Sequence, residues 1–347
     1  MIINKKIISF TFILLLICSG LIYELYSIIY QSNILLPNNT EKEYIYIPTN
    51  ADFNTVVNKL SENGLLININ SFKWLAKQKK YDINIKPGKY RINRKLNNNE
   101  LINLLRSGQQ DPINVTFNNV RNIEQLASNI SLQIEADSTC IIEAIYDTNF
   151  LNKYSMNIEN IACLFIPNTY QFYWNTSAEQ FLQRMVREYN SFWNSERKSK
   201  LKDIGLSSIE VSILASIVEK EQNIKLDERP IIAGLYLNRI RKNMKLESDP
   251  TLIYAIGDFS INRVLNKDKK IESPYNTYKY KGLPPGPICI PSINAIDAVL
   301  NSVSHKFIFM CAKEDFSGYH NFAKTYTKHL INARRYQKAL NKMKIMR

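Results

Sequence analysis

The longest apolar stretch of the chain lies near its N-terminus. Lys5 and Lys6 precede a run over residues 7–29 in which Glu24 is the only charged residue. A helix needs about 20 such residues to cross the hydrocarbon core of a membrane, and a positive flank stays in the cytoplasm. The pattern predicts a cytoplasmic tail over residues 1–6, a transmembrane signal anchor over 7–29, and an exported remainder.

Two other sorting signals fit this N-terminus less well. A cleaved signal peptide needs small residues at a cleavage site after its apolar core, whereas apolar residues resume after Glu24. A lipoprotein signal would use Cys18, but the residue before it is the bulky Ile17, where a small residue is expected. The retained anchor, in contact with membrane lipid, is therefore the interpretation that we prefer.

A small module of alternating helix and strand patterns follows over residues 44–110. Its predicted elements are a strand over 44–48, a helix capped by Asp52, a helix over 72–79, a strand over 89–92 and a helix capped by Asn99. The module is short for a catalytic domain and suits binding or spacing.

The larger unit, residues 111–347, mixes helices and strands without a strict βαβ rhythm. Its predicted elements are a strand over 113–117, helices over 123–130 and 138–146, a helix behind the capping box Thr176-x-x-Glu179, a helix over 208–222, a strand over 307–311 and a basic helix over 325–344. The fold class predicted for the whole chain is α+β rather than a doubly wound sheet.

Composition adds a basic charge to this picture. The 347 residues include 45 Lys and Arg against 31 Asp and Glu, which gives a net charge of +14. A polyanionic partner such as an acidic membrane face or cell-surface polymer would fit. A chain this rich in Asn, Ile and Lys can also become basic through genomic bias. Because no nucleic-acid-binding motif accompanies the charge, we expect no nucleic-acid partner.

Cysteine and histidine spacing gives no sign of a metal site. Four cysteines lie in the exported part: Cys140, Cys163, Cys289 and Cys311. They form no CxxC pair, and the three histidines form no HExxH motif. We expect neither a metal nor another cofactor. We also expect free thiols, although an exported compartment permits disulfides among these four residues.

The helix over 208–222 carries the sharpest chemical signal. The capping box Ser207-x-x-Glu210 fixes its phase. At 100° per residue, small and polar side chains share one face with Glu219. A carboxyl group bordered by small residues lets a bulky substrate approach, and apolar surroundings can raise its pKa towards that of a general acid. Glu219 on a simply solvated face is the alternative.

Ordered motifs around this helix resemble a known family. They include Leu214-Ala215-Ser216-Ile217-Val218-Glu219-Lys220-Glu221, Glu228-Arg229, Leu237-Asn238-Arg239-Ile240, Glu247-Ser248-Asp249-Pro250-Thr251, Ser273-Pro274-Tyr275-Asn276-Thr277-Tyr278, Gly282-Leu283-Pro284-Pro285-Gly286-Pro287 and His320-x-Phe322. Together with the anchor and a small LysM-like N-terminal module, they resemble the endolytic murein transglycosylases, the MltG/YceG-like family. The similarity extends over almost the whole chain.

The resemblance implies a reaction and a cellular location. It implies lytic cleavage of the β-1,4 bond between N-acetylmuramic acid and N-acetylglucosamine within nascent peptidoglycan strands, which leaves 1,6-anhydro ends and limits strand elongation. It also implies a single-pass protein of the bacterial cytoplasmic membrane, with the catalytic domain on the periplasmic or extracytoplasmic side. Peptidoglycan synthases are possible partners.

The resemblance also implies functional residues. Glu219 occupies the position that we take as catalytic, where one carboxyl group would act first as acid and then as base. We consider six further residues as substrate-binding: Asn238, Asp249, Tyr275, Asn276, Tyr278 and His320. Each of them also has a structural interpretation; Asp249, for example, has the form of an N-cap ahead of Pro250.

Two other functions stay open. A hydrolytic muramidase would need a second carboxylate about 5 to 9 Å from the first. Asp249, Glu247 and Glu221 are candidates, of which Glu221 is the weakest because the helical phase points it nearly opposite Glu219. The third possibility is a non-catalytic, membrane-anchored scaffold that binds peptidoglycan through its small module.

Overall fold

The computed structural model describes residues 2–36, 40–261 and 264–343, with side chains described from residue 7 onward. The chain divides into two compact units. The first comprises residues 1–115 with 133–135 and 170–176, and the second comprises 116–132, 136–169 and 177–347. Both mix helices with short strands, so the predicted α+β class is confirmed.

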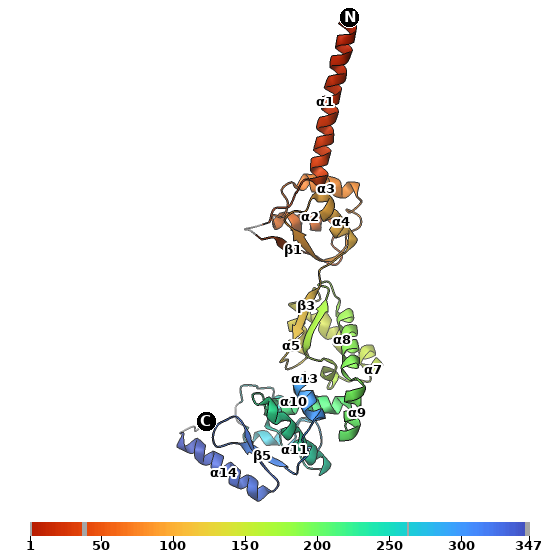
Figure 1. Ribbon diagram of the computed structural model, residues 1–347. Coiled ribbons are helices and arrows are strands. Elements are labelled where there is room, and N and C mark those ends of the chain that lie inside the picture. The colour runs from red at the N-terminus through yellow and green to blue at the C-terminus, as the bar shows by residue number, and fades with distance from the viewer. Residues whose placement is uncertain (1, 37–39, 262–263, 344–347) are drawn as a thin grey trace. The chain divides into compact units, whose positions relative to one another are not determined.

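The N-terminal helix α1 spans Ile2–Tyr30 (Figure 1). Residues Ile7–Tyr30 are long and apolar enough to cross a membrane, and none of that span is buried by protein. A helix with apolar side chains all round is stable only in an apolar environment or under other protein. An apolar N-terminal helix is thus confirmed, and a membrane is the environment that would suit it.

A strand–helix–helix–strand motif forms the centre of the first unit. It comprises β1 (Lys42–Ile47), α2 (Phe53–Glu62), α3 (Ile69–Gln78) and β2 (Gly88–Asn93), and α4 (Asn98–Ser107) follows. The two strands are antiparallel, with Ile45 opposite Tyr90. Side chains of both strands and all three helices share one core. Asp52 caps α2, as predicted.

Two other predicted caps were wrong. The cap of α4 is Asn97, because its capping box with Glu100 must span three residues, which Asn99 cannot do. The cap of α8 (Ala178–Phe192) is Ser177, in a box with Gln180. Thr176 is buried instead, and its hydroxyl donates to the carbonyl of Tyr173.

The second unit is mostly helical. Before its central helix lie α5 (Ile123–Ser131), α6 (Ser138–Tyr146), α7 (Thr148–Lys153), the 3₁₀ turn η1 (Ile161–Leu164), α8 and α9 (Ser195–Ile204). After it lie η2 (Leu226–Glu228), α11 (Arg229–Arg241), α12 (Asp249–Ile256), η3 (Asp268–Lys270), α13 (Ile293–Leu300) and α14 (Tyr326–Lys342). Two further strands, β3 (Ile113–Phe117) and β4 (Asn168–Phe172), have residues in both units. Within the second unit, β5 (Phe309–Ala312) pairs antiparallel with β6 (His320–Ala323).

Helix α10 (Ser208–Glu221) lies at the centre of this unit (Figure 1). It begins with the predicted capping box of Ser207 and Glu210. Nine consecutive residues, Val211 to Glu219, are buried, and α9, α11, α12 and α13 pack around them. The small residues that were expected to face a substrate face protein instead. Ser216, for example, accepts a hydrogen bond from the backbone N–H of Ile288.

Candidate active site

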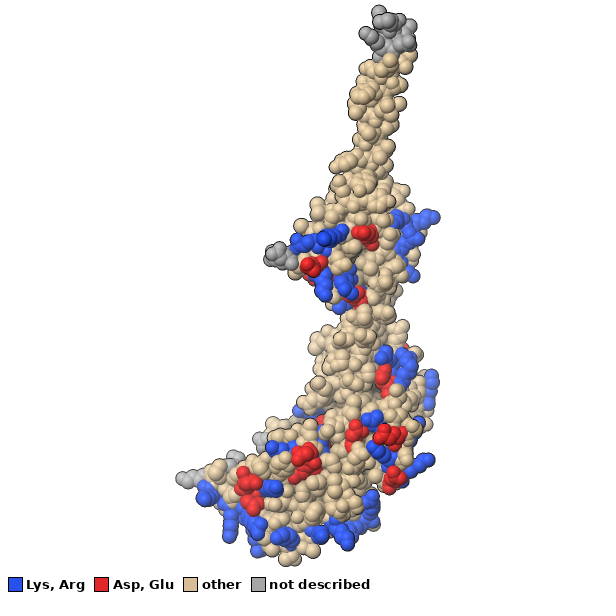
Figure 2. All heavy atoms as spheres, in the orientation of Figure 1, with Lys and Arg blue, Asp and Glu red and all other residues tan. Residues whose placement is uncertain are grey.

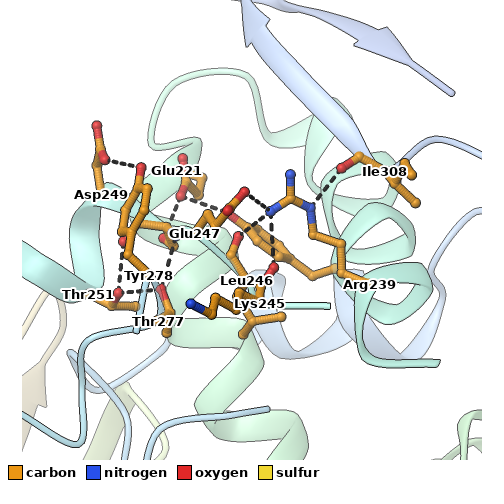
Figure 3. Close-up of polar contacts among 12 residues, drawn as sticks. Glu221, Arg239, Lys245, Leu246, Glu247, Asp249, Thr251, Thr277, Tyr278 and Ile308 are labelled. Carbon is orange, nitrogen blue, oxygen red and sulfur yellow. Dashed lines mark hydrogen bonds and ion pairs between the residues drawn. The ribbon is translucent and has the colours of Figure 1, made fainter. Parts of the chain in front are cut away.

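A cavity of about 210 Å³ lies at the C-terminal end of α10. Carboxylic acids, a guanidinium and a histidine gather around it, and Figure 3 shows most of these side chains. They come from α10, α11, the segment before α12, the loop at Tyr278, and the hairpin of β5 and β6. The lining residues are Glu221, Leu235, Tyr236, Arg239, Leu246, Glu247, Asp249, Tyr278, Met310, Cys311, Ala312 and His320.

Glu221 is the last residue of α10, and its side chain is held by two hydroxyl groups. Ser248 Oγ donates to Glu221 Oε1 at 2.5 Å, and the hydroxyl of Tyr236 donates to the same oxygen at 2.7 Å. Within the described ranges, no donor bonds to Oε2 of Glu221. One oxygen is therefore fixed, and the other is available to a bound molecule.

The surroundings of Glu221 favour its protonated form. Burial raises the pKa of this carboxyl group, against the opposing effect of the hydrogen bonds from Ser248 and Tyr236, and the negative charge of Asp249 raises it further. A carboxyl group that keeps its proton closer to neutral pH is suited to general acid catalysis.

A second carboxylate of the cavity, Asp249, pairs with a tyrosine. The hydroxyl of Tyr278 donates to Asp249 Oδ1 at 2.5 Å (Figure 3). Burial, followed by this bond, raises the pKa of Tyr278, which stays a neutral donor. Asp249 is not an N-cap as predicted. The cap position of α12 belongs to Ser248, in extended backbone, and Asp249 is the first helical residue.

Arg239 fixes the segment that precedes Asp249. Its guanidinium, with a side chain only 8% exposed, donates to the carbonyls of Lys245, Leu246 and Ile308 and pairs with Glu247 Oε2 at 3.0 Å (Figure 3). Glu247 has a φ of 52°, which is unusual for a residue other than glycine. Such strain persists only where the surrounding contacts impose it, and here Arg239 supplies several of them.

His320 enters the cavity from β6 and contacts a buried acid, Glu228. Its Nδ1 lies 2.7 Å from Glu228 Oε2, and its backbone N–H donates to Glu228 Oε1 at 2.8 Å. Glu228 itself is 3% exposed and is not among the residues that line the cavity.

Glu219 lies elsewhere. It is 7% exposed, and its Oε2 accepts hydrogen bonds from the backbone N–H of Ser292 at 2.7 Å and from Ser292 Oγ at 2.6 Å. Ser292 is the N-cap of α13, and Arg229 donates to the hydroxyl of Ser292. A carboxylate at a helix N-terminus stabilises that helix. The geometry gives Glu219 the task of joining α10 to α13.

Three of the six predicted substrate-binding residues do not line the cavity. The amide of Asn238 donates to the carbonyls of His305 and Phe307. Asn276 is completely buried, and its side-chain amide donates to the carbonyls of Lys269 and Ile271. Tyr275 packs against Tyr254, with 4.7 Å between ring centroids. Asp249, Tyr278 and His320 are brought together around Glu221.

Sequence reasoning ranked Glu221 too low and gave no role to three other residues of this arrangement: Tyr236, Ser248 and Glu228. Glu221 was placed last among the acids because it lies across the helix from Glu219. That ranking assumed one solvent-facing side, but α10 is buried on all sides, so its phase cannot say which acid meets the cavity. Within the described part of the chain, no group of three or more His, Cys, Asp or Glu residues could hold a metal.

Comparisons with known proteins agree on one family. The family model of the YceG-like family matches residues 45–335. A protein of Bacillus subtilis named endolytic murein transglycosylase is 29% identical over 301 residues, which cover 82% of each chain. A Streptococcus pneumoniae R6 protein of the same name is 27% identical and is matched over 88% of this chain and 60% of its own. The crystal structure of a YceG-like protein from Listeria monocytogenes aligns with a TM-score of 0.54 at 25% identity, covering 84% of this chain and 98% of that one.

Proposed function

Because the chain belongs to the YceG-like family, we propose that it is a lytic transglycosylase that cuts peptidoglycan glycan strands internally. The names of its relatives in Bacillus and Streptococcus support this enzyme class. The cavity around Glu221 supports it independently, because it joins a protonatable acid to hydroxyl, carboxylate and imidazole groups that suit a sugar.

The proposed reaction breaks the β-1,4 bond between N-acetylmuramic acid and N-acetylglucosamine without consuming water. A protonated carboxyl group donates its proton to the glycosidic oxygen as that bond breaks. The resulting carboxylate then takes the proton of the muramyl C6 hydroxyl while the oxygen of that hydroxyl bonds to C1. A 1,6-anhydro ring forms, and the acid regains its proton.

We assign this acid to Glu221 rather than to Glu219. The single observation that carries the assignment is the position of the two side chains. Glu221 lines the cavity with one oxygen unoccupied, whereas Glu219 is sequestered by Ser292 at the start of α13. The two assignments, Glu221 or Glu219 as the acid, predict different phenotypes for the two mutants.

The test compares Glu221→Gln with Glu219→Gln in the full chain. Uncrosslinked glycan strands are digested, and the products are identified by mass spectrometry. We expect Glu221→Gln to reduce anhydro-muropeptide release at least about 100-fold, because general acid catalysis contributes that much or more. Glu219→Gln should retain activity per folded molecule but lose about 1–2 kcal/mol of stability as the N-terminus of α13 loses its anion. The reverse pattern would return the acid to Glu219.

A hydrolytic muramidase is the second candidate function. Its support is Asp249, a second carboxylate of the same cavity, which could activate water. The same digestion separates the two, because hydrolysis leaves reducing muramic acid ends in place of anhydro ends. Intact strands, with the protein still bound, would favour a non-catalytic scaffold.

We further propose that residues 44–110 form a LysM-like module that holds the glycan strand. The order β1–α2–α3–β2, with antiparallel outer strands, supports it. For the rest of the chain we propose a cytoplasmic tail over residues 1–6, a transmembrane anchor over 7–29 and a catalytic domain over 111–347. Membrane anchoring through α1 would place both modules on the extracytoplasmic side, where cleavage could limit strand elongation beside the synthases.

A further inference from the structure

Glu228 is a buried carboxylate that contacts the cavity only through another residue. It lies at the end of η2 and is 3% exposed. Three donors satisfy it: the backbone N–H of His320, the Nδ1 atom of His320, and the side-chain amide of Gln222 at 2.6 Å.

The bond from His320 determines which ring nitrogen carries the proton. A carboxylate accepts hydrogen bonds and cannot donate them, so Nδ1 must be the N–H of the imidazole. The neutral ring then presents Nε2 as a bare acceptor. In the part of the chain that the structure describes, Nε2 of His320 has no partner, and the ring lines the same cavity as Glu221.

The support for Glu228 comes from the turn directly after Glu221. Gln222 donates both to Glu228 and to the carbonyl of Gly318, and its own oxygen accepts from the backbone of Lys225. Burial pushes the pKa of Glu228 upward, but the hydrogen bonds from His320 and Gln222 outweigh it and hold the pKa below its usual value. The acid stays ionised and so remains an acceptor for Nδ1.

We propose that Glu228 is a positioning residue, which orients His320 so that Nε2 accepts a hydrogen bond from a sugar hydroxyl bound beside Glu221. His320 is then the residue that touches substrate, and Glu228 acts through it. The assignment rests on the proposed function for the identity of the substrate, but the geometry of the pair does not.

The first test reads the tautomer of His320 directly. The full chain, labelled with ¹³C,¹⁵N-histidine, is studied by NMR in detergent at pH 8, where an imidazole is ordinarily neutral. The chain has three histidines, and a His320→Asn variant assigns the signal. We expect an Nδ1–H ring for His320. His305 is the internal reference of opposite sense, because its Nδ1 accepts from the backbone N–H of Phe307. An Nε2–H ring at His320 would overturn the proposal.

The second test is a double-mutant cycle on glycan cleavage. Glu228→Gln and His320→Asn should each lower kcat/KM about tenfold, mainly through KM, as expected for one lost hydrogen bond to substrate. The double variant should be no worse than His320→Asn alone, because Glu228 has no other route to the substrate. Additive losses would mean a merely structural role for Glu228.

A matched control is available on the same turn. Asp227→Asn removes an exposed carboxylate that accepts from the hydroxyl of Tyr319, one residue before His320, and should leave kcat/KM unchanged. If the unsubstituted chain cleaves no glycan yet His320 has the Nδ1–H ring, the proposed function fails and the positioning role stands. If it cleaves glycan and the losses are additive, the positioning role fails alone.

Discussion

Two carboxyl groups of α10, two residues apart, have opposite tasks. Glu219 is an acceptor at the N-cap of α13, where its charge has a permanent partner in the backbone N–H of Ser292. Among the residues that the structure describes, Glu221 accepts from two hydroxyl groups, and burial raises its pKa. A raised pKa means that the ionised form is less favourable in the folded chain than in the unfolded chain. Glu221 therefore reduces stability where it is ionised.

A neutral isostere at position 221 should stabilise the fold. In Glu221→Gln the amide oxygen can still accept from Ser248 and Tyr236, and no charge is buried. Below the unfolded-state pKa of Glu221, both forms are neutral and the variants should unfold alike. As the pH rises through the folded-state value, the parent chain loses stability and Glu221→Gln does not. Thermal unfolding at pH 5 and pH 8 checks this, and an equal Tm difference at both pH values would contradict it.

At the scale of elements, close backbone contacts keep the site together. α11 carries Tyr236 and Arg239 into the cavity, and its Gly234 lies against the loop before β5. A Cβ at this glycine would lie 2.3 Å from the carbonyl oxygen of Val303. Real Cβ atoms do not approach backbone this closely, so the loop and the helix can meet only at a glycine.

The sign of the stability change in Gly234→Ala tests this close contact. Alanine in a helix interior normally stabilises by about 1 kcal/mol relative to glycine. Here we expect a loss of about 1–3 kcal/mol, because the methyl group must displace the loop at Val303. The exposed Ser199→Ala on α9 serves as a control and should be neutral or mildly stabilising. Denaturant unfolding measures both, and a stabilised Gly234→Ala would show that the loop moves freely.

The sequence predicted the elements better than it predicted the site. Asp52 and Ser207 were correct as helix caps, because each is followed by an unambiguous apolar pattern. Asn97 was missed because three consecutive asparagines offered equivalent caps. Which acid lines the cavity depends on the side of a fully buried helix that faces it, and contacts with distant residues such as Ser292 and Ser248 decide that. The hydrophobic periodicity of the helix itself does not encode these long-range contacts.

For the whole molecule, part of the excess of basic residues that gives the charge of +14 lies on one helix. Figure 2 shows Lys and Arg side chains gathered on the second unit where α14 lies. That helix contributes Lys328, Arg334, Arg335, Lys338 and Lys342 and contains no acidic residue. A basic surface of this kind suits an anionic lipid or wall polymer at low ionic strength.

The N-terminal helix α1 also belongs to the first unit. Its C-terminal end packs against α3 and α4, and Asn98 donates to the carbonyl of Ile28. Asn33, which is 6% exposed, donates to the carbonyl of Asn68 and to the side chain of Asn98. The boundary between α1 and the small module is therefore a set of hydrogen bonds rather than a free linker.

Truncation should reveal this connection. A chain that begins at Ser27 should leave the membrane fraction and keep the unfolding temperature of its small module. A chain that begins at Ile34 should lose about 2–4 kcal/mol from that module, since one buried and three part-buried hydrogen bonds are removed. Calorimetry on both chains measures the difference. Identical transitions would mean that residues 27–33 contribute nothing to the fold.

The burial of α10 has one more consequence, for conformational entropy. An acid on a mobile loop would lose its freedom each time a glycan binds, and every turnover would include that cost. Glu221 terminates a helix that is immobilised when the chain folds, and Ser248 and Tyr236 fix its rotamer through their hydrogen bonds. In the proposed mechanism, the acid is therefore ordered once, during folding, and the substrate binds to a group that is already in place.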